Sequence, residues 1–362
     1  MRKTTRRNRR MQQVSLITNI FFCLITLAAL TGCIFLMLQN YSMRNASVEA
    51  MGRIQELEGI ASEYIYSQKD LDNQVEAAVQ AAMEEERKAL LGGIKQKVLE
   101  GDSIISVFRD FFTEDVVVYA DGGYHFFPIS DKLKKHNYAR ENFIIKDEEI
   151  IYRDEAGGVD SQKGIDVSKH QGEIDWKGVS EDGISYAFIR AGYRGNSEGK
   201  LVEDEYFQDN IEGALEHDID VGIYFYTQAL TEEEAVEEAE FVLGLIEDYD
   251  VAYPVVIDLE ETGSDTARTA EMTKEEYTRA AIAFCERIRE AGYTPMIYGN
   301  IKTFMIMLDM EQIEAYDKWF AYYDTSVYFP YDFTVWQYSS TGAVRGIGGD
   351  VDMNVCMKEY KQ

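Results

Sequence analysis

The sequence predicts an α/β fold for its second half: an irregular, TIM-like (β/α) barrel over residues 161–362. A transmembrane helix, a helical stalk and a small α+β module are expected before it. Three observations lead to the barrel. Short runs of aliphatic and aromatic residues alternate with amphipathic helical segments, eight such runs fit into about 200 residues, and polar side chains stand where the runs end. An open doubly wound sheet is the alternative, but the glycine-rich phosphate loop that would favour it is missing from the sequence.

The chain begins with a basic tail and a long apolar run. Six of the first ten residues are Arg or Lys, and no charged residue occurs between Met11 and Met43. The 25 residues from 14 to 38 are long enough, as a helix, to span a hydrocarbon core of about 30 Å. Because basic residues precede this run, we expect a single-pass anchor in the cell membrane, with residues 1–13 cytoplasmic and the catalytic part extracellular.

Two other readings of the apolar run stay open. One is a cleaved signal peptide. The other is a lipoprotein, since the sequence LTGC at 30–33 resembles a cleavage box that would leave Cys33 lipidated. The apolar residues that continue from 34 to 38 favour the uncleaved anchor, because a mature lipoprotein normally turns polar at this point.

Residues 41–100 are expected to form a helical stalk. They are rich in Glu, Ala, Gln and Lys and contain no Pro, and apolar residues such as Ile54, Leu57 and Ile60 recur at steps of three and four. The pattern weakens towards Gly92 and Gly93. The stripe predicts either self-association through residues 45–99, as in a coiled coil, or a solvated spacer helix.

Residues 101–160 predict a small α+β module and linker. The sequences VVVY at 116–119 and YHFF at 124–127 flank a turn sequence, DGG, which is typical of a β-hairpin. Further short strands are expected at 143–145 and 149–152, followed by a turn-rich linker at 154–163. No chemistry is expected in this module, and we interpret His125 as a hairpin side chain.

The barrel itself is expected from residue 164 onward. Its strands are predicted at 164–168, 185–191, 221–226, 253–259, 295–298, 319–322, 334–338 and 350–353, with helices at 205–217, 231–247 and 273–290. Thr231 with Glu234, and Thr273 with Glu276, have the spacing of capping boxes, and Gly292 is placed to end the last helix. The last three connections are too short for full helices, so the barrel should be irregular there.

Composition excludes several functional classes. A formal net charge of −29 argues against a nucleic-acid partner, which would require basic surface to neutralise phosphates. The four Cys and four His are scattered without the spacing of a metal site. Neither a metal nor a cofactor is therefore expected.

Polar and aromatic residues converge where the strands end. Asp258 and Glu260 follow a buried strand and, at positions i and i+2, would point to the same side about 6.5–7 Å apart. In a parallel barrel the carboxyl ends of all strands meet at one mouth, where catalytic residues lie. The residues expected there are Asp166, Arg190, Tyr224, Tyr226, Asp258, Glu260, Tyr298, Trp319, Tyr322, Trp336, Gln337 and Asp352.

This combination predicts carbohydrate chemistry. Burying unpaired acids costs several kcal/mol each, so a barrel core would not keep four of them without a function. Paired carboxylates suit glycosidic bond cleavage, in which one group donates a proton while another stays ionised. Aromatic faces stack on the C–H faces of sugars, which suits the Tyr and Trp residues named above.

Several short motifs are also similar to those of a known family. They are GIDVS at 164–168, IDW at 174–176, IRAG at 189–192, GIYFY at 222–226, DLE at 258–260, WQY at 336–338 and VDMN at 351–354. Together, over residues 164–357, they resemble the glycoside hydrolase family 25 lysozymes. The resemblance implies a hydrolase that cleaves the β-1,4 bond between N-acetylmuramic acid and N-acetylglucosamine in peptidoglycan glycan strands. It also implies that Glu260 is the proton donor and that Asp166, Asp258 and Asp352 support it.

The mechanism leaves two routes open. Glu260 must be protonated near neutral pH, and we expect the charge of Asp258 and partial burial to raise its pKa. One Asp then acts as a nucleophile, or the N-acetyl group of the substrate attacks instead. Two other functions compete: a non-catalytic peptidoglycan-binding protein that retains the sugar groove, and an envelope scaffold whose working parts are the stalk and the module.

Overall fold

The structure of this protein is a computed structural model that describes residues 2–63, 68–154, 159–264 and 266–360. Side chains are described from residue 26 onward within these ranges, except at 28, 29, 61–63 and 159. The chain divides into two compact units, Met1–Gln96 and Lys97–Gln362. Each unit is described by itself.

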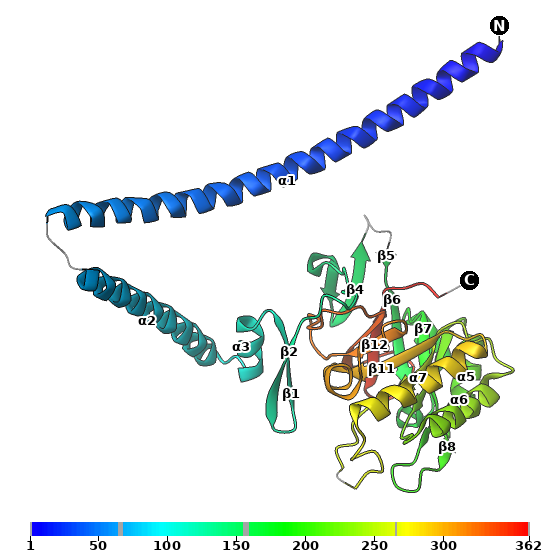
Figure 1. Ribbon diagram of the computed structural model, residues 1–362. Coiled ribbons are helices and arrows are strands. Elements are labelled where there is room, and N and C mark those ends of the chain that lie inside the picture. Colours follow the sequence, from blue (N-terminus) through cyan, green and yellow to red (C-terminus); the bar gives the residue numbers. More distant parts are fainter. Residues whose placement is uncertain (1, 64–67, 155–158, 265, 361–362) are drawn as a thin grey trace. The chain divides into compact units, whose positions relative to one another are not determined.

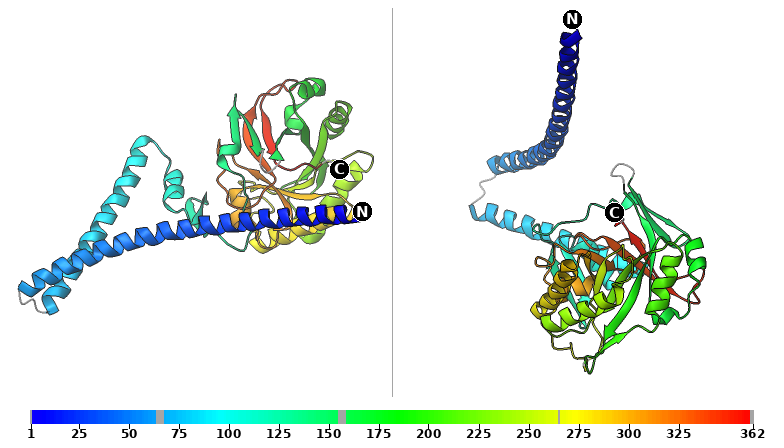
Figure 2. Two further views of the ribbon diagram at one scale, coloured as in Figure 1. Left: turned by 90° about the horizontal axis from the view of Figure 1, so that it is seen from above. Right: turned by 90° about the vertical axis from the view of Figure 1, so that its right-hand side faces the viewer.

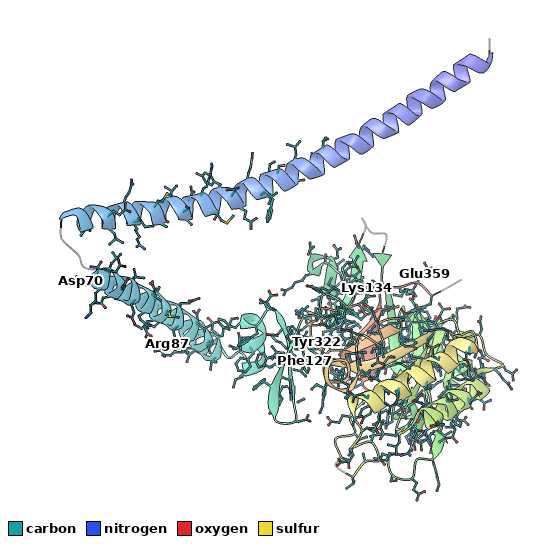
Figure 3. All side chains as sticks on the ribbon, in the orientation of Figure 1. Asp70, Arg87, Phe127, Lys134, Tyr322 and Glu359 are labelled. Carbon is teal, nitrogen blue, oxygen red and sulfur yellow. The ribbon has the colours of Figure 1, made fainter. Side chains whose placement is uncertain are left out.

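The first unit is helical. Helix α1 runs over Arg2–Glu63 and α2 over Gln68–Glu100, continuing past the two glycines at which the apolar pattern weakens. No residue of α2 is buried, and its side chains, Asp70 and Arg87 among them, project on all sides (Figure 3). Within the ranges described above, no helix is long and apolar enough to cross a membrane. The expected span at 14–38 falls on α1, and the side chains of 14–25, 28 and 29 lie outside the description.

The second unit is built on a closed barrel of eight strands (Figures 1 and 2). In chain order they are β6 (Gln162–Val167), β7 (Tyr186–Arg194), β9 (Asp220–Tyr226), β10 (Val255–Asp258), β11 (Pro295–Asn300), β12 (Asp317–Ala321), β13 (Val335–Gly342) and β14 (Val351–Cys356). Pairing of β6 with both β7 and β14 closes the ring, and the short β8 (Leu201–Glu203) extends from β7. The predicted eight-stranded α/β barrel is confirmed.

One feature of the predicted topology is wrong, because β14 is antiparallel to both of its neighbours. A parallel crossover needs a dozen or more residues. Residues 343–350, which join β13 to β14, are too few for one, so the chain turns back. The barrel is therefore parallel through β13 and closes on an antiparallel strand.

Helices cover the outside of the barrel, and α5, α6 and α7 lie side by side along it in Figure 1. They are α4 (Trp176–Glu181), α5 (Phe207–Glu216), α6 (Glu232–Ile246) and α7 (Lys274–Glu290), with short turns η2 (Lys169–Gln171) and η3 (Thr303–Met307). Thr273 and Glu276 form the expected capping box. The Thr231 hydroxyl also caps its helix, but the Glu234 carboxylate accepts from the Leu230 N–H instead of completing a box. An inner aromatic core, including Phe188 and Trp319, fills the barrel.

The small module belongs to the same compact unit as the barrel. It contains α3 (Ile104–Phe111), a hairpin of β1 (Asp115–Ala120) and β2 (Gly123–Pro128), the turn η1 (Arg140–Asn142), and a sheet of β3 (Phe143–Lys146), β4 (Glu149–Asp154) and β5 (Val159–Asp160). Asp121 and Gly122 form the hairpin turn with φ of 53° and 75°. The Val117 N–H donates to the Tyr328 hydroxyl, and Arg109 donates to the Tyr322 hydroxyl at 2.7 Å. The module is thus attached to the barrel by hydrogen bonds.

Candidate active site

A cavity of about 420 Å³ opens where the parallel strands of the barrel end. It is lined by Asp166, Ser168, His170, Gln171, Arg190, Tyr224, Tyr226, Asp258, Glu260, Tyr298, Trp319, Tyr323, Gln337 and Asp352. The structure brings together all four predicted carboxylates and six of the eight other predicted site residues. It does not bring Tyr322 or Trp336 to this cavity.

Strand register explains how the carboxylates meet. Asp166 near the end of β6 lies directly opposite Asp352 of β14. Opposite residues of antiparallel strands have their Cβ atoms about 4.5–5.5 Å apart, so two acids come from neighbouring positions. Asp258 ends β10, in register with Tyr226 of β9 and Tyr298 of β11. Two aromatic hydroxyl side chains therefore flank the second pair of acids.

A hydrogen-bond network holds Asp166 as an acceptor. The side-chain amides of Asn354 and Gln337 donate to its Oδ2 at 2.7 and 2.8 Å. The Trp319 indole N–H donates to Asn354 Oδ1 at 2.7 Å, which orients that amide. The hydroxyls of Tyr298 and Tyr323 donate to Gln337 Oε1 at 2.8 and 3.0 Å and orient the other amide. Asp166 is therefore positioned by side chains from four other strands and from the segment after β12.

Asp258 is the least compensated acid in the cavity. Its side chain is 6% exposed, and its Oδ1 has no hydrogen-bond partner among the described residues. Burial raises the pKa of Asp258 well above its usual range, and the charges of Glu260 and Asp166 raise it further. Arg190 acts in the opposite sense, but its guanidinium is ion-paired with Asp204 at 2.7 Å. A buried acceptor without a partner is a common mark of a functional site.

Glu260 also has a raised pKa. Burial is the main cause, a hydrogen bond with Tyr298 opposes it, and the charge of Asp352 adds to it. The like charge that acts on Glu260 is thus that of Asp352, whereas we expected Asp258 to supply it. Within the pair formed by Asp258 and Glu260, the like charge acts on the more deeply buried Asp258, whose pKa Glu260 raises. Asp352 has a raised pKa as well, from burial, and that of Asp166 lies well above its usual range.

Tyr322 and Trp336 lie on the other side of the barrel wall. Trp336 is fully buried, donates its indole N–H to the Tyr322 carbonyl at 2.7 Å, and packs edge-on against Phe143 of the module. The Tyr322 ring stacks on Phe320, and its hydroxyl accepts a hydrogen bond from Arg109. These two aromatic residues therefore join the module to the barrel.

The prediction also left out residues that line the cavity or hold its acids in place. Tyr323 and Asn354 were missed, although Asn354 follows Asp352 by two positions and so lies on the same side of β14. His170 and Gln171 come from the turn η2, which Ser168 caps. A turn of this kind lacks the alternating pattern of a strand. Its position shortly after Asp166, at the end of β6, is the one sequence signal that it lies at the cavity.

The arrangement supplies the parts of an acid catalyst. Glu260 and Asp258 hold protons more tightly than ordinary carboxyls do, and no ion pair within the described part of the chain involves any of the four acids. The exposed side chain of Tyr323 is among the residues that line the cavity. A protonated acid beside further carboxyls and aromatic rings suits cleavage of a glycosidic bond.

Known sequences match the barrel. The profile of the glycosyl hydrolases family 25 matches residues 165–347. The uncharacterized protein YegX of Escherichia coli K12 is 29% identical over 204 residues, which cover 53% of this chain and 68% of that protein. Lysozyme M1 of Streptomyces globisporus is 28% identical over 218 residues, which cover 58% of this chain and 71% of that protein.

A solved structure matches the fold. The modular autolysin LytC from Streptococcus pneumoniae aligns with a TM-score of 0.51 at 25% identity, over 66% of this chain and 57% of its own. The same autolysin in complex with a synthetic peptidoglycan ligand aligns with the same TM-score at 22% identity. This chain therefore spans less than two thirds of the length of that autolysin.

Proposed function

The chain belongs to the glycosyl hydrolases of family 25, and from this premise we propose that it is an N-acetylmuramidase. It cleaves the β-1,4 bond between N-acetylmuramic acid and N-acetylglucosamine in peptidoglycan glycan strands. The observation that carries the proposal is the cavity in which Asp166, Asp258, Glu260 and Asp352 converge without ion-pair partners in the described ranges. The relative Lysozyme M1 is by name a lysozyme, which agrees with this proposal.

In this proposal Glu260 protonates the oxygen of the leaving sugar. Its raised pKa favours the protonated form that a general acid needs, and a hydrogen bond with Tyr298 orients the carboxyl. As the bond breaks, positive charge develops on the sugar ring, and the carboxyl group of Asp352, which lines the same cavity, is placed to stabilise it. Glu260 then takes a proton from the water that completes hydrolysis.

The burial of the remaining acids favours participation of the substrate's own N-acetyl group. A nucleophilic carboxylate must be ionised, whereas burial raises the pKa of both Asp166 and Asp258 well above the usual range. The unpaired Oδ1 of Asp258 is free to accept the acetamido N–H and to align its oxygen for attack. Inhibition by a thiazoline analogue of the cyclised sugar supports this route, and a covalent glycosyl-enzyme detected by mass spectrometry would rule it out.

The test of the function is product analysis. The full chain is incubated with purified peptidoglycan, and the reduced products are identified by mass spectrometry. Muropeptides ending in reduced N-acetylmuramic acid are expected, and none should form with Glu260→Gln. If the wild-type chain binds peptidoglycan in a pull-down but releases no reducing ends, the alternative of a non-catalytic wall-binding protein is correct.

We further propose that the enzyme acts in cell-wall turnover from the outer face of the membrane. The support is the charge-free run at 14–38, which is preceded by basic residues, and the long helical segments after it, namely the rest of α1 and α2. Residues 45–99 would hold the barrel away from the bilayer or join two copies of the chain. Membrane fractionation with protease protection tests the anchor and its orientation, and cross-linking of Lys residues in α2 tests self-association.

A further inference from the structure

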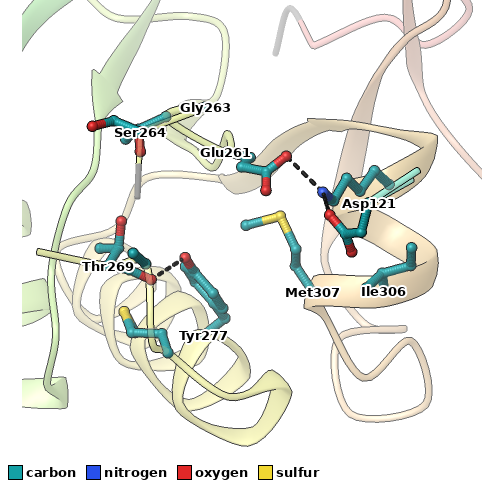
Figure 4. Close-up of a pocket in the computed structure, with 12 residues that line it drawn as sticks. Asp121, Glu261, Gly263, Ser264, Thr269, Tyr277, Ile306 and Met307 are labelled. Atoms are coloured by element: carbon teal, nitrogen blue, oxygen red, sulfur yellow. Dashed lines mark hydrogen bonds and ion pairs between the residues drawn. The ribbon is translucent and has the colours of Figure 1, made fainter. Parts of the chain in front are cut away.

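A second pocket, of about 320 Å³, lies next to the active site on the chain (Figure 4). Its lining is Asp121, Glu261, Thr262, Gly263, Ser264, Thr269, Ala270, Met272, Tyr277, Lys302, Ile306 and Met307. Glu260 lines the active-site cavity, and Glu261, the next residue, lines this pocket. Consecutive Cα atoms are about 3.8 Å apart, so the two sites are neighbours.

The pocket has a charged rim made jointly by the barrel and the module. Lys302 donates to Asp121, in the hairpin turn, at 2.8 Å and to Glu261 at 2.6 Å, as the dashed lines in Figure 4 show. The Lys302 side chain is only 18% exposed, whereas those of Asp121 and Glu261 are 64% and 54% exposed. Two accessible carboxylates and one covered ammonium give the rim a net negative charge.

The remaining wall is fixed and mixed in polarity. The Tyr277 hydroxyl donates to the Thr269 carbonyl at 2.9 Å, and the Thr269 hydroxyl donates to Gln228 at 2.9 Å. Thr262 and Ser264 add side-chain hydroxyls, while Met272, Ile306 and Met307 give an apolar floor. Peptides need this combination, because they present amide hydrogen-bonding groups and small apolar side chains together.

We propose that this pocket binds the peptide stem of the substrate, a short peptide with a free amine, while its sugar lies in the catalytic cavity. The inference rests on the proposed function. A peptide of three to five residues reaches about 10–17 Å when extended, which is ample for a neighbouring pocket. The negative charge of the rim favours an ammonium group over a carboxylate. Because Asp121 lies in the hairpin of the module, the module contributes to the substrate site.

The test compares the full chain on two substrates: a peptide-free glycan of alternating N-acetylmuramic acid and N-acetylglucosamine, and the same glycan with amine-bearing stems. In the double variant Asp121→Asn with Glu261→Gln, KM for the stem-bearing glycan should rise about 5- to 20-fold with kcat unchanged, since each exposed pair supplies a few-fold. KM for the peptide-free glycan should not change. Acetylation of the stem amine should raise KM for the wild-type chain to the same extent.

Two controls separate ligand binding from attachment of the hairpin. Lys302→Gln removes both ion pairs yet leaves both acids, so stem-bearing glycan should bind at least as well as it does to the wild-type chain. If Lys302→Gln weakens it as much as the double variant does, the cluster only holds the hairpin and the proposal is wrong. Asp131→Asn, which breaks an exposed pair with Lys135 elsewhere in the module, should change nothing.

A binding measurement keeps the outcome independent of catalysis. Titration of the amine-bearing stem peptide alone into the full chain should give heat that is lost in the double variant. Absence of binding to the wild-type chain overturns the pocket assignment, whatever the cleavage assays show. Binding of the peptide without cleavage of either glycan would instead overturn the proposed function and leave the pocket assignment standing.

Discussion

Buried carboxylates occur in two regions of the barrel unit, and their surroundings differ. On the helical side, Glu238 accepts from Arg194 at 2.7 Å and from the Thr227 hydroxyl at 2.6 Å. At the strand ends, Asp258 and its three acidic neighbours share a cavity without any such ion pair in the described residues. In the first region the carboxylate is paired within the protein, and in the second the carboxyl groups stay available to a ligand in the cavity.

The comparison also shows that a perturbed pKa alone does not identify a functional residue. Burial raises the pKa of Glu238 to about 7, although Thr227 and Arg194 lower it. Glu238 would therefore pass as a candidate acid by its pKa. Glu238 is hydrogen-bonded on both carboxylate oxygens and lies outside the cavity, so its role is structural.

The largest expected effect is that of Glu260→Gln. Removing the proton donor should lower kcat on peptide-free glycan about 10²- to 10⁴-fold, the range that general acid catalysis contributes. The melting temperature should not fall. Glu261→Gln, one residue away and outside the cavity, is the matched control and should retain kcat. Substantial turnover by Glu260→Gln would mean that another of the four acids is the donor.

Arg194→Met tests the structural region. It leaves Glu238 buried without its guanidinium, which should reduce the free energy of unfolding by about 3–5 kcal/mol. The loss of Arg194 raises the pKa of Glu238 further, so the carboxyl can protonate when the pH falls. The deficit should therefore be larger at pH 8 than at pH 5, as measured by urea unfolding at both. An equal deficit at the two pH values would show that Arg194 contributes packing only.

Asp258→Asn tests the opposite expectation for the catalytic region. The folded-state pKa of Asp258 lies above its unfolded value, so ionisation costs stability as the pH rises through that interval. Asn removes this cost and should stabilise the protein by about 1 kcal/mol at pH 7, or about 2–4 °C, with no gain at pH 4. Activity should fall about 10- to 100-fold. If the variant is less stable than the wild-type chain at pH 7, Asp258 stabilises the fold as Glu238 does, and this expectation is wrong.

The order of the barrel strands could be predicted from sequence because each is a short apolar run bounded by turns. The direction of β14 does not follow from its apolar residues, since such a run looks the same for a parallel and an antiparallel strand. It follows only from the short connection before it, which is too short for a parallel crossover. In the cavity, the four acids were predictable because a buried strand end with acidic residues is costly without a function. Asn354, one of the two amides that donate to Asp166, was not predicted as a site residue, because its role depends on a contact with a residue 188 positions earlier in the chain.

Tyr322 and Trp336 lie away from the cavity for one reason. Successive residues of an extended chain point to opposite sides. Trp319 and Tyr322 are three positions apart, so only one of the two faces the cavity. Trp336 and Gln337 are adjacent, so the same holds for them. The side chains that enter are Trp319, Tyr323 and Gln337. The attachment of the module to the barrel could not be predicted either, because its contacts, such as that of Arg109 with Tyr322, join positions far apart in the sequence.

The smallest expected effects come from Tyr322→Phe and Tyr323→Phe, adjacent residues on the two sides of the wall. Tyr322→Phe removes the hydrogen bond from Arg109 and should cost about 1 kcal/mol of stability without changing KM for peptide-free glycan. Tyr323→Phe removes a donor to Gln337, which orients Asp166, and should raise KM about 2- to 5-fold with little effect on stability. Urea unfolding and initial rates on the same preparations measure both. If Tyr322→Phe changes KM as much as Tyr323→Phe, the module acts on the sugar site through Tyr322, and the division between structural and catalytic regions does not hold at this wall.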